Sequence, residues 1–548
     1  MAACGLAFVA AVAAVSGCAA QDGEDSQQPA ASAAATTLGT TTAPPETATT
    51  ATQTTTTAPQ TTTTTTTTTE PPATTTTTTT TPPETITTQT TTTTTTTTAP
   101  PEPTNTTTLT PYQRDLAAAA RMAPDFVMPN DCRPPPLGSP YSMPNAPRAY
   151  RSGVHAGVDF LCSAPGDPVV SVLSGQVAVA AGGYVDPTPS EWNELLGIAI
   201  ALGDTPAYTN AMLSGSYVVV DHGIIDGVGH VVSLYAHLDA VDPGIRVGMR
   251  VDAGQRLGGV GNTGTRAGTS GDRYGQLHLH WNFYVGDRYL GAGLSAAETR
   301  AVYAELFSHA TGTGAGTPPP GDATVTPGPG PAGPGTITPS GRKLLAEPIT
   351  FEEARAAAEL LSAGIVVPSD CGPVPLDRTS ALPNAPRPYR SGIHQGIDFW
   401  CPVLGHQAVA ALAGRVVVAV GDFEDPTPLE WNQLLDTAAV LGTTPPYTLM
   451  MLYGNHVAVD HGIIDGVGHV VSLYAHLDGL EPGIRPGLRV EAGQPLGTIG
   501  NSGTRAGAAG AVHDQLHLHW ELHIDGQYLG IGLSHEDTRA VYTALFSG

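Results

Sequence analysis

The chain contains the same sequence twice, and this internal repeat constrains its fold more than any other feature. The segment Tyr150-Arg-Ser-Gly-Val-His-Ala-Gly-Val-Asp-Phe160 returns as Tyr389-Arg-Ser-Gly-Ile-His-Gln-Gly-Ile-Asp-Phe399, 239 positions later. The same offset relates His237 to His476, so no net insertion separates these landmarks. The repeat is interpreted as two tandem copies of one domain, each of roughly 200 residues. The two copies are therefore expected to share one fold.

Composition places the boundaries around the two copies. Residues 36–110 are nearly all Thr and Pro, with an unbroken Thr run at 61–69. Such a segment has almost no large apolar side chains to bury and cannot offset the entropy of ordering its backbone. A Gly-, Pro- and Thr-rich segment separates the copies and is typical of a linker. The predicted organisation is a stalk at 19–109, a first domain at 110–309, a linker at 310–343 and a second domain at 344–548.

The first 18 residues are typical of an export signal. Residues 4–15 form an Ala-rich apolar stretch that is too short to span a bilayer as a helix. Val15-Ser-Gly-Cys18 is similar to the bacterial lipobox, in which the Cys is lipidated, although no Lys or Arg precedes the apolar stretch. We predict a lipoprotein-type signal at 1–18 and an exported protein, held in the cell envelope by a lipid on Cys18. The alternative is an ordinary signal peptide with a chance cysteine.

The charge of the chain excludes one class of partner. The formal net charge is −25, with only 23 Lys and Arg, and no basic cluster occurs. Nucleic-acid binders carry a basic face, so we expect no nucleic acid as a partner. The acidic balance is interpreted as solubility outside the cell.

The remaining cysteines form one pair in each copy. These are Cys132 with Cys162 and Cys371 with Cys401. An even number of cysteines in an exported protein suggests disulfides. Each bridge would close a loop of about 30 residues, worth roughly 3.5 kcal/mol in the chain-entropy model.

Strand-forming residues dominate each copy. β-Branched runs bounded by Gly, Asp and Pro occur at 169–180, 216–221 and 231–237. Capping boxes that start at Thr110 and Thr350 predict a leading helix in each copy. A further capping box starts at Thr188, before Trp192 and Leu195 at helical spacing, and its counterpart starts at Thr427. We predict a mainly β protein: two antiparallel β-rich domains, each with a leading helix and a short helical insertion that walls the substrate groove.

Two small motifs of the first copy carry candidate chemistry. His155-x-x-x-Asp159 lies in a Gly-containing, β-branched context, and His278-Leu-His280 has the spacing that places both rings on one face of a strand. A catalytic zinc takes three protein ligands from His and carboxylate and leaves one position open for water. His155, Asp159 and one of the paired histidines would complete that set. The other paired histidine and His237 would orient the water and hydrogen-bond the developing oxyanion.

The order and context of these motifs resemble the lysostaphin-like, LytM-type zinc metallopeptidases of bacterial cell walls, which have a duplicated hybrid motif. The resemblance covers about 150 residues of each copy and includes the Gly261-Asn-Thr-Gly264 turn. It implies one Zn²⁺ per domain, and therefore two per chain. The implied zinc ligands are His155, Asp159 and His280, and in the second copy His394, Asp398 and His519. The implied catalytic histidines are His237, His278, His476 and His517. The helical insertion and the cysteine pair are not part of the pattern common to the family.

The resemblance also implies a function. It implies an endopeptidase that hydrolyses the peptide cross-links of bacterial peptidoglycan by attack of a zinc-bound water, with stem peptides or cross-bridges as its partners. The alternative is a non-catalytic peptidoglycan-binding module or an activator of another wall hydrolase, as in relatives that have lost the zinc residues. A biotinyl or lipoyl carrier is excluded because neither copy contains a Lys.

The remaining histidines are weaker candidates. Five histidines of the second copy align with other residue types in the first and are poor candidates for essential chemistry: His406, His456, His513, His523 and His535. His222 and His230 have counterparts in His461 and His469. His222 is interpreted as part of a turn.

Overall fold

The structure is a computed structural model that describes residues 109–132, 135–310 and 349–548. The predicted export signal with Cys18 lies outside the described residues. The same is true of nearly all of the predicted stalk and linker, and of the first residues of the predicted second domain. Among the residues that are described, no helix is long and apolar enough to cross a membrane.

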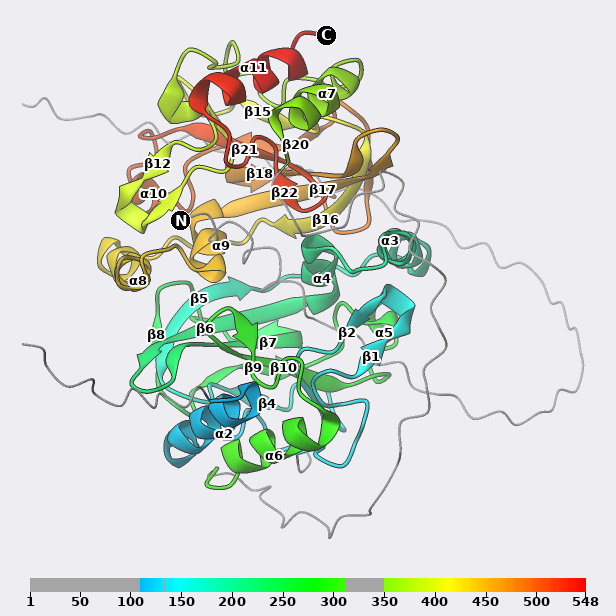
Figure 1. The fold of residues 1–548 in the computed structure, drawn as a ribbon, viewed down its shortest axis with the longest axis vertical. Coiled ribbons are helices and arrows are strands. Elements are labelled where there is room, and N and C mark those ends of the chain that lie inside the picture. The colour runs from blue at the N-terminus through cyan, green and yellow to red at the C-terminus, as the bar shows by residue number, and fades with distance from the viewer. Residues whose placement is uncertain (1–108, 133–134, 311–348) are drawn as a thin grey trace, which may run out of the picture. The chain divides into compact units, whose positions relative to one another are not determined.

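Each copy combines short strands with a few helices (Figure 1). The helices of the first copy are α2 (Pro111–Met122), α3 (Pro189–Leu202), α4 (Ala207–Ser214), α5 (Arg266–Thr269) and α6 (Ala296–Leu306), with 3-10 turns at Ala123–Asp125 and Ala149–Arg151. Its strands are β1 (Pro147–Arg148), β2 (Gly153–Val154), β3 (Val158–Leu161), β4 (Pro168–Val170), β5 (Gly175–Ala181), β6 (Ser216–Ile225), β7 (Gly229–Val241), β8 (Arg250–Val251), β9 (Arg256–Val260), β10 (His278–Val285) and β11 (Arg288–Tyr289).

The second copy repeats these elements. Its helices are α7 (Phe351–Leu361), α8 (Pro428–Leu441), α9 (Pro446–Tyr453), α10 (Arg505–Ala508) and α11 (His535–Leu545), with 3-10 turns at Thr379–Ala381 and Pro388–Arg390. Its strands are β12 (Pro386–Arg387), β13 (Gly392–Ile393), β14 (Ile397–Trp400), β15 (Gln407–Val409), β16 (Gly414–Val420), β17 (Asn455–Ile464), β18 (Gly468–Leu480), β19 (Arg489–Val490), β20 (Pro495–Ile499), β21 (His517–Ile524) and β22 (Gln527–Tyr528).

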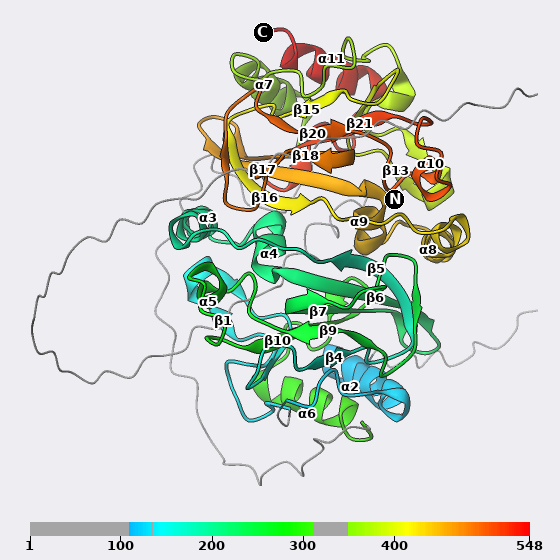
Figure 2. The ribbon, with the colours of Figure 1, turned by 180° about the vertical axis from the view of Figure 1, so that it is seen from behind.

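One nine-stranded antiparallel sheet forms the body of each copy. In the first, the order is β11-β10-β7-β6-β5-β8, with β3 paired to β10 and β9 paired to both β4 and β7. Strands β5, β6 and β7 run side by side (Figure 2). The second copy has the same order, from β14 through β21 and β18 to β19. The predicted fold class is confirmed: both copies are mainly β, with a leading helix and a helical insertion.

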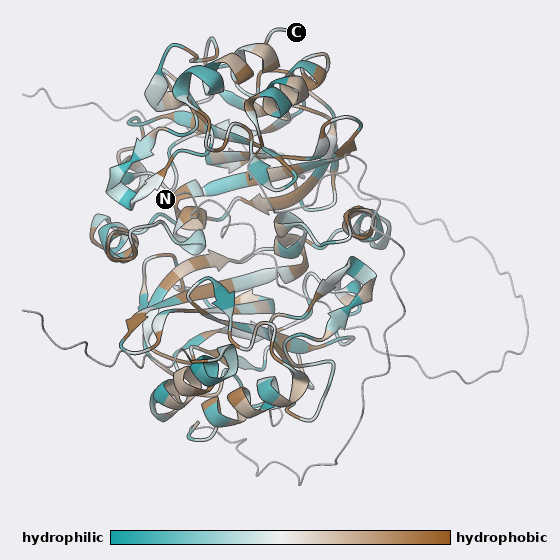
Figure 3. Cartoon of the chain, in the orientation of Figure 1, coloured by the Kyte–Doolittle hydropathy of each residue, from teal (hydrophilic) through white to brown (hydrophobic). Residues whose placement is uncertain are grey.

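The alternation of side chains along β10 separates the core from the histidine side of the strand. Leu279, Trp281 and Phe283 belong to the hydrophobic core, where Trp281 packs at 5.6 Å from the ring of Phe126. Helices α2 and α6 pack against each other (Figure 1), and both mix hydrophilic and hydrophobic residues (Figure 3). Because successive side chains of a strand point to opposite faces, His278 and His280 lie on the face of β10 opposite to Trp281.

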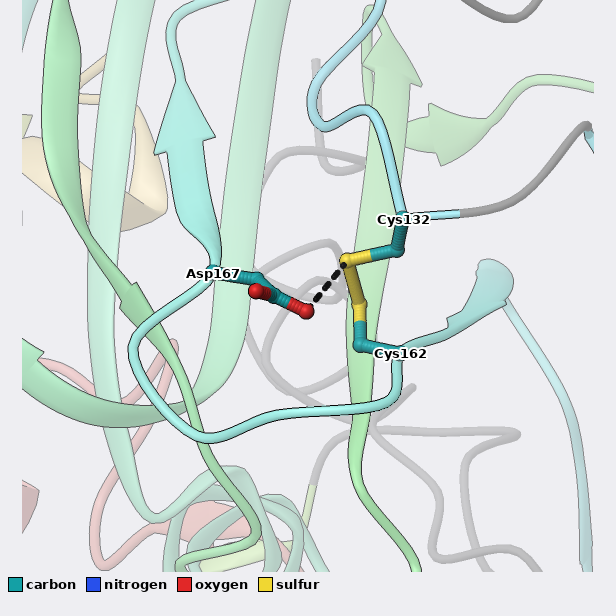
Figure 4. A group of neighbouring side chains, drawn as sticks. All are labelled: Cys132, Cys162 and Asp167. Atoms are coloured by element: carbon teal, nitrogen blue, oxygen red, sulfur yellow. Dashed lines mark hydrogen bonds between the residues drawn. A yellow bond between two sulfur atoms is a disulfide. The ribbon is translucent and has the colours of Figure 1, made fainter.

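A disulfide fixes the segment that precedes β1. Cys132 is joined to Cys162, which follows β3 directly, and Asp167 Oδ2 lies 3.6 Å from Cys132 Sγ (Figure 4). Cys371 and Cys401 form the equivalent bridge in the second copy. These are the two pairs expected from the sequence. Each bridge ties the leading segment to the strand that carries Asp159 or Asp398.

Candidate metal centre

Neighbouring strands bring the sequence motifs together. Strand β3 pairs with β10 in a register that places Asp159 opposite His280. His155 precedes β3, and its backbone N–H donates to the carbonyl of Ala146 at 2.8 Å. Strand β7 pairs with the other edge of β10 and places Ala236 opposite His280. His237 follows Ala236 directly and therefore lies near His280, with the two ring centroids 5.8 Å apart. The second copy has the same registers, with Asp398 opposite His519.

Three donor atoms converge in each copy. In the first, His155 Nε2, Asp159 Oδ1 and His280 Nδ1 lie 2.8 to 3.0 Å from one another. In the second, the same atoms of His394, Asp398 and His519 are also 2.8 to 3.0 Å apart. All six side chains are buried. Two imidazoles and one carboxylate around a single point match the ligand set of a catalytic zinc.

Outer contacts orient these donors. His155 Nδ1 donates to the carbonyl of Met143 at 3.0 Å, so Nε2 is the nitrogen with a lone pair for a metal. Arg148 donates to Asp159 Oδ2 at 3.2 Å, which leaves Oδ1 as the oxygen that faces the two histidines. Leu382 and Arg387 make the same contacts in the second copy. The two arginines were not among the residues predicted from the sequence.

Burial and the neighbouring charges set the protonation of the cluster. Burial lowers the pKa of His280 to about 4, and that of His394 to about 4 as well. Burial alone would raise the pKa of Asp159, but the adjacent histidines hold it well below its usual range. Neutral imidazole and ionised carboxylate are the forms that bind a metal cation. His519 differs: burial acts to lower its pKa, but hydrogen bonds to Asp398 and Glu521 raise it to about 9.

His237 has a strained backbone within strand β7. Its φ is 61°, in the left-handed region, and His476 has a φ of 63°. A non-glycine residue held there costs on the order of 1–3 kcal/mol, so its surroundings must enforce it. The 261–264 turn supplies that support, since His237 Nδ1 donates to the carbonyl of Thr263 at 2.8 Å and its own carbonyl accepts from Gly261 at 2.9 Å.

His278 lies beside the cluster but outside it. Its ring centroid is 4.6 Å from that of His237, and its Nδ1 donates to the carbonyl of Gln276 at 2.7 Å. Its Nε2 lies 3.8 Å from Asp159 Oδ1, compared with 2.8 Å for the Nδ1 of His280. His517 makes the same three contacts in the second copy. The structure thus brings all five predicted site residues of each copy together.

A cavity of about 590 Å³ opens onto the cluster of the second copy. Trp431 and Asp436 of α8 line it, together with Tyr453 of α9. Trp400 lines it as well, and its ring is stacked on His517 at 4.8 Å. The helical insertion therefore contributes to the cavity that contains the histidines.

His222 and His230 are held by structural contacts, and the interpretation of His222 as part of a turn is wrong because it lies within strand β6. The ring of His222 bonds Ser233 Oγ at 2.5 Å and the carbonyl of Ser174 at 3.1 Å. His230 Nε2 lies 2.9 Å from Asp221 Oδ1. None of these contacts involves the three-donor cluster.

Glu521, at the second site, is a further residue that the sequence did not identify. Glu521 accepts a hydrogen bond from His519 Nε2 at 2.8 Å. The period of two that pairs His517 with His519 also places Glu521 and His523 on the same face of β21. The same alternation in the sequence could therefore have identified Glu521 as a neighbour of His519.

Comparison with known proteins finds a similarity in both copies. The model of peptidase family M23 matches residues 198–291 and 392–530. Each copy therefore contains a region that is similar to this family. The first match leaves out His155 and Asp159, which the repeat aligns with His394 and Asp398 inside the second match. The resemblance to LytM-type peptidases in two copies is confirmed.

Several solved structures of M23 proteins are similar to this chain. A point mutant of the catalytic domain of the prophage-encoded M23 protein EnpA from Enterococcus faecalis has 16% identity and a TM-score of 0.16, over 25% of this chain and 74% of that one. A putative peptidase M23 from Pseudomonas aeruginosa has 22% identity and a TM-score of 0.17, over 34% and 57%. A putative glycyl-glycine endopeptidase LytM from Ruminococcus gnavus has 18% identity and a TM-score of 0.16, over 27% and 45%. A search of curated proteins found no similar sequence.

Proposed function

We propose that each copy is a zinc-dependent endopeptidase that hydrolyses the peptide cross-links of bacterial peptidoglycan. The observation that carries this proposal is the buried convergence of two imidazole nitrogens and one carboxylate oxygen in both copies. The residues that would hold one zinc ion per domain are His155, Asp159 and His280, and His394, Asp398 and His519. Their donor types and their outer hydrogen bonds fit zinc, and three protein ligands leave room for water.

The chain's own residues supply the proton chemistry. A zinc ion bound at the cluster would acidify water and polarise the carbonyl of the scissile peptide. Because His278 Nδ1 donates to a backbone carbonyl, Nε2 of its neutral ring can accept a proton from the attacking water. His237 is fixed in the same way through its Nδ1. Once protonated, either ring can donate a hydrogen bond to the developing oxyanion or a proton to the leaving amine.

Peptidoglycan digestion tests this function. Purified peptidoglycans with different cross-links are incubated with the full chain, and the released muropeptides are identified by mass spectrometry. We expect cleaved cross-bridges or stem peptides with new free amines, and we expect the release to stop when a chelator removes the metal. A protein that sediments with peptidoglycan but releases no peptide would instead be a binding module or an activator.

We further propose that the protein is exported and anchored by a lipid on Cys18. The two disulfides favour an oxidising compartment, and the M23 family suggests an exported protein. Cys18→Ala is expected to abolish incorporation of labelled palmitate and to keep the precursor from being processed at that residue. A variant that is still labelled and still processed would contradict the anchor.

A further inference from the structure

The two copies differ at several buried positions beside the candidate metal centre, and one of these positions carries a carboxylate in the second copy only. The second copy has Glu521 where the first has Asn282. Glu521 lies two residues after His519 on β21, on the same face of the strand, and it is 1% exposed. Burying a carboxylate is costly unless hydrogen bonds and charges compensate for it. The partners of Glu521 therefore indicate what it does.

Three side chains donate to this carboxylate. Oε1 accepts from His519 Nε2 at 2.8 Å and from Tyr453 Oη at 3.0 Å, and Oε2 accepts from His523 Nε2 at 2.7 Å. His519 uses its other nitrogen, Nδ1, to face Asp398. A carboxylate that holds the far nitrogen of a metal-ligating imidazole fixes the tautomer and the orientation of the ring and makes the ligand more basic.

The first copy lacks this arrangement. Its residues at the positions of Tyr453, Glu521 and His523 are Ser214, Asn282 and Tyr284. Asn282 Nδ2 donates to Tyr284 Oη at 2.9 Å, and His280 Nε2 is buried without a hydrogen-bond partner in the part of the chain that the structure describes. The arginine contacts are the same in both copies. The second site therefore has a carboxylate beside its metal ligands, that of Glu521, which the first site lacks.

We propose that Glu521 is a positioning residue that makes the second copy the tighter zinc site of the chain, so that the two copies load with metal unequally. The inference rests on the proposed role of His519 as a ligand. Glu521 keeps the proton of His519 on Nε2, which leaves the Nδ1 lone pair for the metal, and its charge strengthens that donor. Outer partners of this kind are worth about 10- to 100-fold in metal affinity.

The test measures one site at a time in the full chain. His280→Ala disables the first site and leaves the second to be measured, and His519→Ala does the reverse. Each protein is titrated with a chelator of known zinc affinity at about pH 9, where protons compete less for the imidazoles, and the zinc that stays bound is counted. We expect the second copy to hold zinc at least about 10-fold more tightly.

Glu521→Gln tests the charge at nearly constant size. In the His280→Ala chain, this change is expected to weaken zinc binding by about 10-fold or more. Tyr453→Phe is the matched control, since it removes one donor to Glu521 but keeps the contact with His519, and it should shift the affinity by less than about 3-fold. Unfolding temperatures with and without zinc separate a folding defect from a positioning defect. Loss of positioning reduces the stabilisation that zinc adds, because that increment follows from affinity.

The outcomes distinguish this inference from the function on which it rests. Equal zinc affinities of the two copies would overturn the inference, and so would unchanged affinity in Glu521→Gln. Failure of both copies to bind zinc would contradict the proposed metallopeptidase function itself.

Discussion

His280→Ala is expected to remove nearly all zinc from the first copy, and His519→Ala from the second. Each substitution leaves two protein donors where a catalytic zinc takes three. Among the described residues, each donor group contains only these three side chains and no fourth member that could take the place of the lost imidazole. Metal analysis of the full chain should fall from about two zinc ions to about one in either variant and to none in the double variant. Peptide release should cease in the double variant.

An exposed histidine provides the control for this result. His513 is exposed and does not belong to either donor cluster, so His513→Ala should retain both zinc ions and full activity. A His280→Ala, His519→Ala double variant that still bound zinc at the level of the unaltered chain would show that the metal is held elsewhere.

The sequence predicted those features of the site that depend on local geometry. The alternation of side chains along a strand is enough to place His278 and His280 on one face, and the structure has this arrangement on β10. The approach of Asp159 to His280 joins residues 121 positions apart, and no local pattern encodes such a pairing. The ligand preference of zinc suggested that one of the paired histidines joins Asp159, and the resemblance to a known family assigned that role to His280.

An alignment of the two copies does not identify residues that serve only one of them. Because the first copy has Tyr284 at the matching position, the alignment makes His523 a poor candidate, yet His523 donates to Glu521 beside the second metal centre. Matching positions identify the residues that both copies use, and they hide those that serve only one. The left-handed backbone of His237 had no sequence signal either, since it is imposed by contacts with the turn around Thr263.

His278→Ala is expected to leave the zinc in place and to lower the rate of hydrolysis by about 100-fold or more, the scale of a general acid–base or oxyanion group. The geometry separates this residue from its neighbour His280. His278 Nε2 lies 3.8 Å from Asp159 Oδ1, whereas the three donor atoms of the cluster lie within 3.0 Å of one another. Loss of the His278 ring therefore removes a proton acceptor but no ligand.

The measurement requires that the other copy be silent. His278→Ala is made in a chain whose second copy carries His519→Ala, and His517→Ala in a chain that carries His280→Ala. Zinc content and the rate of peptide release are then determined on the same preparation. We expect about one zinc per chain in both, because each retains one complete ligand set. A ligand is needed to hold zinc, whereas a proton acceptor is needed only to speed the reaction. If His278→Ala released the metal as fully as His280→Ala does, His278 would be a ligand. If it left hydrolysis unchanged, His278 would not be the proton acceptor, and either result would contradict the proposed roles.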